Sequence, residues 1–106
     1  MTRAELQTML SSITGFSGKV AYRAFPVGNA PSLPFITFLE EGENDFSADG
    51  ITYHAAHNYV VELYTENRDE TSEAAVAAAL TNAGVYYRKD IFYLEDEHCF
   101  MIEYHI

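Results

Sequence analysis

The chain has 106 residues, of which 16 are acidic and 6 basic, and its net charge is −10. This length predicts a single domain over residues 1–106, and a hydrophobic content of 48% is typical of a globular protein and not of a disordered one. The excess of acids argues against free binding to nucleic acid, which needs a basic face. No apolar run approaches the roughly 18 residues of a membrane helix. No apolar core of a signal peptide follows Met1, and one cysteine excludes an internal disulfide, so we expect a reducing cytoplasm.

The first 34 residues predict a helix, a short strand and an irregular loop. Thr2 is a good N-cap, and Gly15 is expected to end the helix. The apolar side chains between them recur at helical spacing and form one stripe: Leu6, Met9, Leu10 and Ile13. Residues 20–25 have the composition of a strand. The three prolines between positions 26 and 34 then exclude both helix and central strand from that segment.

Residues 33–65 predict a long β-hairpin, the most informative feature of the chain. Two runs rich in aromatic and β-branched side chains flank a stretch of turn-forming residues. Both arms are expected to exceed the usual strand length of about 5–6 residues, so the hairpin should protrude. On the second arm, Tyr59, Val61 and Leu63 should share one face. The opposite face then mixes apolar and polar groups, as in a partly covered sheet.

A second helix and a second hairpin complete the chain. Asp69 is a good N-cap, Glu70 and Glu73 lie near the positive end of the helix dipole, and Gly84 is a natural stop. Residues 85–93 and 100–106 predict two strands around the acidic turn 95–97. The element order α-β-β-β-α-β-β predicts an α+β fold with a mainly antiparallel sheet, two helices packed on one side and a protruding hairpin.

The hairpin tip contains the residues for which we predict an assembly contact: Asn44, Asp45, Phe46, Ser47 and Asp49. Asn and Asp at turn positions, followed by Gly50, are also explained by local turn chemistry alone. Phe46, however, is costly to leave in water, and a partner that covers it would remove that cost. Both interpretations remain open at this point. The acids of the tip lack the spacing of a calcium-binding loop.

The sequence contains no arrangement that predicts catalysis, a cofactor or a metal. On a strand, His54 and His57 would point to opposite faces, and His98 adjoins Cys99, which is poor geometry for one ion. Cys99 is expected to be a small core residue and not a nucleophile. Neighbouring acids such as Glu40 and Glu41 have no evident pocket, and there is no glycine-rich phosphate loop. We therefore predict a protein that is not an enzyme, without cofactor or metal.

Four segments carry a resemblance to a known group of proteins: Leu-Pro-Phe-Ile (33–36), Asn-Asp-Phe-Ser-Ala-Asp-Gly (44–50), Asn-Tyr-Val-Val-Glu-Leu-Tyr-Thr-Glu (58–66) and Gly-Val-Tyr-Tyr (84–87). Together they resemble small proteins from the head-to-tail connector and tail-completion region of tailed phages and prophages. The element order is also similar to the tail-terminator fold, in which helices cover one side of a sheet and a hairpin protrudes. The chain is shorter than many tail terminators, so other neck proteins remain open.

The resemblance implies a structural subunit of the virion and no catalytic residues. Such a tail terminator or head–tail joining protein forms a homo-oligomeric ring, usually hexameric, that meets the tail tube and the connector. DNA would pass through the ring without specific binding, and the protein would be found in the host cytoplasm during assembly and in the virion afterwards. The alternative is a small acidic inhibitor or DNA mimic that binds a host protein, which the net charge permits.

Overall fold

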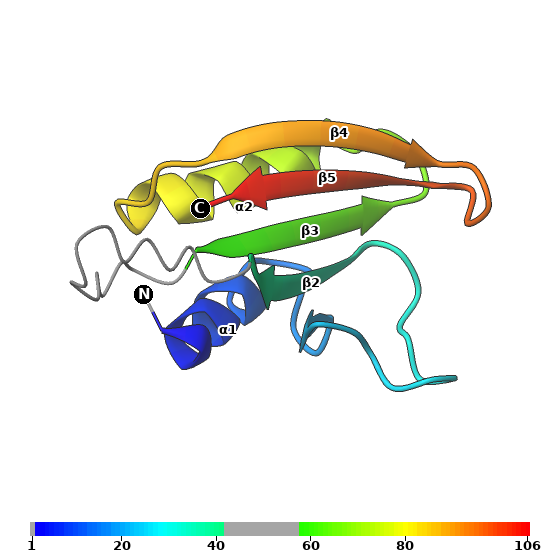
Figure 1. The fold of residues 1–106 in the computed structure, drawn as a ribbon, viewed down its shortest axis with the longest axis horizontal. Coiled ribbons are helices and arrows are strands. Elements are labelled where there is room, and N and C mark those ends of the chain that lie inside the picture. The colour runs from blue at the N-terminus through cyan, green and yellow to red at the C-terminus, as the bar shows by residue number, and fades with distance from the viewer. Residues whose placement is uncertain (1, 42–57) are drawn as a thin grey trace, which may run out of the picture.

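The computed structural model describes residues 2–41 and 58–106, in which two helices and five strands form an α+β fold (Figure 1). The elements are α1 (Arg3–Ser11), β1 (Val20–Tyr22), β2 (Phe35–Glu40), β3 (Tyr59–Thr65), α2 (Glu70–Asn82), β4 (Arg88–Leu94) and β5 (Cys99–His105). The strands pair in the order β1-β2-β3-β5-β4, and every pair except β1 with β2 is antiparallel. The predicted fold class and element order are therefore confirmed.

Both helices begin at the residues that the sequence predicted. At α1, the Glu5 amide donates to the Thr2 hydroxyl at 3.2 Å and the Thr2 amide donates to the Glu5 carboxylate at 3.4 Å, which is a capping box. At α2, the Ser72 amide donates to the Asp69 carboxylate at 3.1 Å. The amide of Gly84 donates to the Thr81 carbonyl at 3.0 Å, and Gly84 has a φ of 74°. This left-handed residue ends α2 because glycine adopts it without steric cost.

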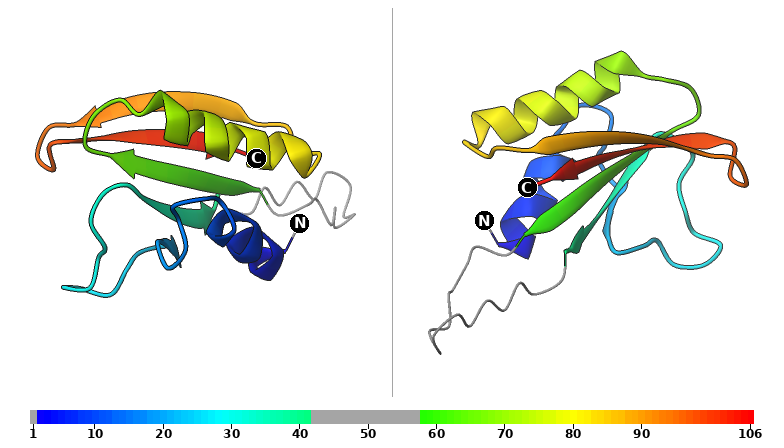
Figure 2. Two further views of the ribbon diagram at one scale, coloured as in Figure 1. Left: turned by 180° about the vertical axis from the view of Figure 1, so that it is seen from behind. Right: turned by 45° about the horizontal axis from the view of Figure 1, so that its top comes forward.

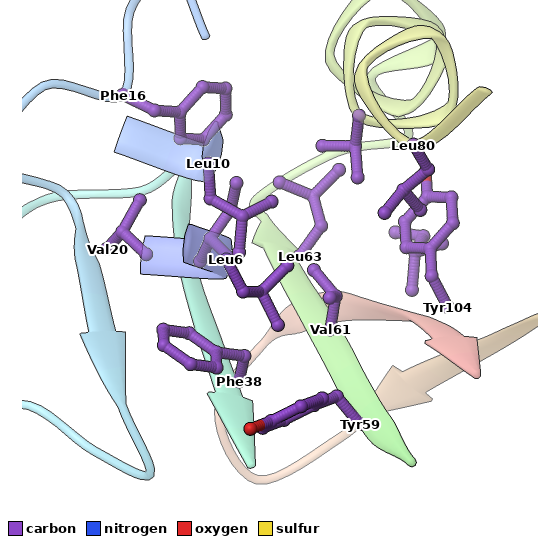
Figure 3. Close-up of a cluster of buried hydrophobic side chains, with 13 residues drawn as sticks. Leu6, Leu10, Phe16, Val20, Phe38, Tyr59, Val61, Leu63, Leu80 and Tyr104 are labelled. Carbon is purple, nitrogen blue, oxygen red and sulfur yellow. The ribbon is translucent and has the colours of Figure 1, made fainter. Parts of the chain in front are cut away.

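The two helices cover the same face of the sheet, as Figure 2 shows in the view from behind. The strand register places Val61 beside Tyr104 and Leu63 beside Ile102, so these side chains form one continuous apolar layer under the helices. α1 contributes Leu6 and Leu10 to this layer (Figure 3). The remaining core members come from the segment after α1, from β1, β2 and β3, and from α2: Phe16, Val20, Ile36, Phe38, Tyr59, Val76 and Leu80. One core therefore holds both helices against the central strands.

The predicted long hairpin is present where the structure describes it. β2 and β3 pair from Phe35 with Tyr64 to Glu40 with Tyr59, and the Glu41 amide donates to the Asn58 carbonyl at 2.9 Å. The two strands have six and seven residues, which is an ordinary strand length. The expected extension and protrusion of the arms fall on residues 42–57, outside the described part of the chain.

Several strand boundaries differ from the expectation, for local reasons. β1 ends at Tyr22 and not at Phe25, because the next residue, Arg23, has a φ of 68°. β4 begins at Arg88 and not at Val85, because the Val85 amide donates to the Leu80 carbonyl at 3.0 Å and completes the end of α2. β5 begins at Cys99 and not at Phe100, because the turn spans only residues 95–98 and ends at His98, whose φ is 51°. Along β5 the fully buried Ile102 and Tyr104 alternate with the partly exposed Met101 and Glu103.

Candidate interaction surface

The strand β4 forms one long edge of the sheet. It pairs with β5 through seven residues, from Arg88 with His105 to Leu94 with Cys99, and no described strand pairs with its other side (Figure 1). A strand in this position presents a row of backbone amides and carbonyls to which another strand can add. The edge strand β4 is therefore the described element best placed to receive a partner.

Apolar side chains gather on β4 without being buried. Ile91, Phe92 and Tyr93 are 43%, 45% and 50% exposed, and Tyr86, just before the strand, is 96% exposed. Ile91 and Tyr93 lie on the face that carries the helices, and Phe92 lies on the open face, because successive side chains of a strand alternate. Exposed apolar groups on consecutive residues are unusual for a surface that stays in water, and they indicate a place of contact.

The hydrogen bonds of β5 reveal which backbone groups of β4 point outward. Tyr59 and Ile106 exchange two hydrogen bonds of 3.2 Å and 2.9 Å, so the even-numbered residues of β5 bond to β3. The odd-numbered residues of β5 then bond to β4, where their partners include Asp90 and Phe92. It follows that Lys89, Ile91 and Tyr93 direct their amides and carbonyls away from the sheet, toward the free edge.

Charges of opposite sign flank the apolar centre of β4. Arg88 and Lys89 open the strand, whereas the exposed acids Glu95, Asp96 and Glu97 follow its last residue. The Arg88 guanidinium lies 3.5 Å from Asp90 and its side chain is 72% exposed, so it remains available to an outside partner. The strand thus runs from a basic end through an apolar centre to an acidic end.

A buried carboxylate fixes the start of β4 to α2. Glu73 is 2% exposed. Its carboxylate accepts hydrogen bonds of 3.0 Å and 3.1 Å from the Arg68 guanidinium. It also forms an ion pair with the Lys89 ammonium, at a distance of 2.8 Å. The hydrogen bonds from Arg68 are the main reason that the pKa of Glu73 lies below its ordinary value, with burial opposing them and Lys89 adding to them. The Tyr104 hydroxyl also donates to the Glu73 carbonyl at 2.8 Å. The basic end of β4 is therefore held in place.

The open face of the sheet carries a second polar cluster, around His105. Its Nδ1 lies 2.6 Å from Glu41 Oε1, and its Nε2 lies 3.2 Å from Glu103 Oε1 and 3.3 Å from Asp90 Oδ2. When the ring is protonated, both N–H groups donate to these carboxylates, which joins the end of β2 to β4 and β5. Asp90, Glu103 and His105 are also residue types that bind divalent metals, with ligand atoms within 4.8 Å of one another.

Beside this cluster, Glu62 is a carboxyl group that the fold partly removes from water. Burial raises the pKa of Glu62, against a lowering by the hydrogen bond of 2.9 Å that it accepts from the Thr37 hydroxyl. Glu103, its cross-strand neighbour, raises the pKa further. Burial likewise raises the pKa of Tyr64 to about 12. These shifts follow from the packing of the open face and indicate no reactive group.

A hollow of about 550 Å³ lies at the start of α2, lined by Leu33, Pro34 and residues 65–71. Two of its charged groups already have partners: the Asp69 carboxylate accepts from Ser72, which lowers its pKa, and the Arg68 guanidinium donates to Glu73. Thr65 is 2% exposed, and its hydroxyl is the one buried side-chain polar atom without a partner among the described residues. We assign no ligand to this hollow and regard the Thr65 hydroxyl as a cost to stability.

The residues that the sequence analysis proposed for the contact lie outside the described part of the chain. These are Asn44, Asp45, Phe46, Ser47 and Asp49, and the same holds for His54 and His57. Cys99 is 4% exposed, which agrees with the expected small core residue, and burial raises the pKa of its thiol. The sequence analysis did not single out β4 or His105. The signals were present as a run of Ile91, Phe92 and Tyr93 between opposite charges, but an edge position cannot be read from a single strand.

Comparisons of the chain with protein-family models, curated proteins and solved structures find no match. Neither helix of the described residues is long and apolar enough to cross a membrane.

Proposed function

We propose that this chain is a structural subunit of a phage virion, a tail terminator or head–tail joining protein that assembles with copies of itself at the junction of tail and neck. The proposal rests on the resemblance of residues 20–106 to tail-completion proteins. The observation that supports it in the structure is the free edge of β4, where Ile91, Phe92 and Tyr93 are exposed. A ring subunit needs surfaces that a neighbour completes, and an unpaired apolar edge is such a surface.

The charge of the chain fits a ring through which DNA passes. A basic lumen would neutralise phosphates and hold DNA in a salt-dependent manner, whereas a net charge of −10 disfavours such binding. The polar clusters of the described residues also favour a structural role over a catalytic one. His105 contacts carboxylates, Cys99 is buried, and Glu73 is held by Arg68 and Lys89. Each of these groups has an evident part in holding the fold.

Loss of the gene from a phage or prophage that encodes this chain tests the proposal. We expect particles with filled heads and separate tails, or with tails of irregular length, seen by electron microscopy, and we expect the chain in purified wild-type virions by mass spectrometry. Complementation with the wild-type chain should restore complete particles. Normal virions without the chain would contradict the proposal, and recovery of the chain in complex with one host protein would favour the acidic inhibitor instead.

A second test concerns the hairpin tip. If Phe46 is an assembly contact, Phe46→Ala should melt nearly like the wild type and fail to complement. A core phenylalanine would instead cost about 3–5 kcal/mol on truncation. Thermal melting and complementation, measured together, decide between these outcomes. A large loss of melting temperature with normal complementation by the folded fraction would show that the tip packs on its own domain.

A further inference from the structure

The charge pattern of β4 is self-complementary when the strand is paired with a second copy in the antiparallel direction. Lys89, Ile91 and Tyr93 direct their backbone groups outward, so an antiparallel pairing must place odd-numbered residues of the two copies opposite one another. The register with Phe92 opposite Phe92 satisfies this condition. It places Ile91 opposite Tyr93 and Asp90 opposite Leu94, each twice. The bases Lys89 and Arg88 then come near Glu95 and Asp96 in the turn of the other copy.

Neighbouring registers lose this complementarity. Moving the centre to Ile91 places Asp90 opposite Phe92, which forces a carboxylate against an aromatic ring. Moving the centre to Tyr93 places Ile91 opposite Glu95, which forces a carboxylate against an aliphatic side chain. With Phe92 at the centre, Phe92 meets Phe92, Ile91 meets Tyr93, and both bases come near acids, as favourable cross-strand pairs require. Asp90 opposite Leu94 is the one unfavourable pair of this register.

We propose that two copies of this chain pair antiparallel through β4, about a two-fold axis at Phe92, and extend the sheet across both subunits. The two Phe92 side chains lie side by side on the open face, because residues at a non-hydrogen-bonded position are the closest pair across two strands. Ile91 of each copy covers Tyr93 of the other on the helical face. The outward amides and carbonyls of Ile91 and Tyr93 then have partners, and the exposed apolar groups of β4 are covered.

This inference concerns the purified chain alone and does not depend on the proposed function. A two-fold pair has identical ends, whereas a ring that joins head to tail has unlike ends, so the pair is a form of the free protein. It would cover the edge that the proposed function offers to a neighbouring ring subunit. The contact is small, and we expect a dissociation constant between about 10 and 1000 μM.

Sedimentation equilibrium of the full chain, from about 10 μM to 1 mM, measures the pairing. Phe92→Asp places two carboxylates against each other at the axis and should weaken the dimer at least about tenfold, the size of a lost aromatic pair. Val27→Asp is the matched control, since it also replaces an exposed apolar side chain by a carboxylate, but between β1 and β2 at the other edge of the sheet, and it should leave the dimer unchanged. A monomer over the whole range, or equal effects of both variants, would overturn the pairing.

Exchange of charges across the axis identifies the register. Arg88→Glu alone and Asp96→Arg alone each place like charges together, and each should weaken the dimer about three- to tenfold at low salt. A mixture of the two variants should associate like the wild type, because the heterodimer restores both pairs, and so should the double variant. Arg23→Glu, which follows β1 at the opposite edge of the sheet, controls for net charge. Single variants that weaken the dimer without recovery in the mixture would refute this register.

Discussion

The two edges of the sheet are built in opposite ways. β1 has three residues, and its outward carbonyls are used within the chain: the Gln7 amide donates to the Val20 carbonyl at 3.1 Å, and the Ala24 amide donates to the Tyr22 carbonyl at 2.9 Å. The Tyr22 ring is covered by the Arg3 guanidinium at 4.5 Å from its centroid. β4 has seven residues, outward groups without a partner among the described residues, and exposed apolar side chains. Within residues 2–41 and 58–106, one edge of the sheet is closed and the other is open.

The open edge at β4 is not a consequence of the small size of the domain, because the same chain closes its other edge at β1. The chain closes β1 with a side-chain amide from α1 and a tight turn at Arg23, whose φ is 68°. To close the outer edge of β4 in the same way, a helix or loop would have to lie beside that edge. α2 instead contacts β4 from the face, through Lys89 and Glu73. The open apolar edge therefore supports the proposal that β4 is an interface.

The comparison predicts that side chains buried between the sheet and the helices contribute much to the free energy of unfolding, and that side chains at the open edge contribute little. Leu63 is fully buried between β2 and β5, so Leu63→Ala should cost about 2–5 kcal/mol through lost burial and a cavity. Phe92 is 45% exposed, and Phe92→Ala should cost less than about 1 kcal/mol in dilute, monomeric protein. Urea denaturation at low concentration measures both. Equal costs would show that the open edge is part of the monomer's core.

The attachment of β4 to α2 should be the next largest contribution. Glu73→Gln removes a buried charge from Arg68 and Lys89, and because both cations are partly exposed we expect a loss of about 1–3 kcal/mol. The pKa of Glu73 is lower in the folded chain than the ordinary 4.5, so this contribution is complete at neutral pH and is lost as the pH falls below about 4.5. The unfolding free energy of wild type and variant should therefore converge in acid. A constant difference from pH 7 to pH 2 would exclude the ion pairs as its cause.

Replacement of the unpaired hydroxyl at the end of β3 should stabilise the protein. Thr65→Val keeps the shape and the β-branch while it removes a buried polar atom that has no partner among the described residues, so we expect a gain of about 1 kcal/mol. Thr37→Val is the contrasting control, since the Thr37 hydroxyl donates to Glu62 and its loss should destabilise. The melting temperatures of the two variants should move in opposite directions. A lower melting temperature for Thr65→Val would mean that its hydroxyl has a partner in solution.

The smallest effect is expected at the closed edge. Gln7→Ala frees the Val20 carbonyl and should cost less than about 1 kcal/mol, because water can replace the lost donor. Hydrogen exchange of the β1 amides should increase while that of the β3 amides remains slow. Gln7→Glu, which keeps the length but loses the donor, should behave like Gln7→Ala. An unchanged exchange rate in β1 would mean that Gln7 has no part in closing this edge.

Much of the architecture could be predicted from local sequence patterns. The capping residues Thr2 and Asp69 and the glycine after α2 each act within one turn of helix, so a few neighbouring residues were enough to place them. Alternation along β3 similarly identified its buried face, which carries Tyr59, Val61 and Leu63. The boundary of β4 was less predictable, because Val85 could continue the strand or complete the end of α2.

What the sequence by itself determined is the set of elements, their order and the side chains that must be buried, since all of these depend on contacts between near neighbours. Only the tertiary structure decided that β5 lies between β3 and β4, which makes β4 an edge. The same pairing brings Glu41, Asp90 and Glu103 around His105, and Lys89 to Glu73, across separations that no local pattern records. Interfaces and polar clusters depend on such long-range pairing. A strand in the middle of a sheet has its backbone groups paired on both sides, whereas the same strand at an edge leaves one row of amides and carbonyls to which another chain can pair.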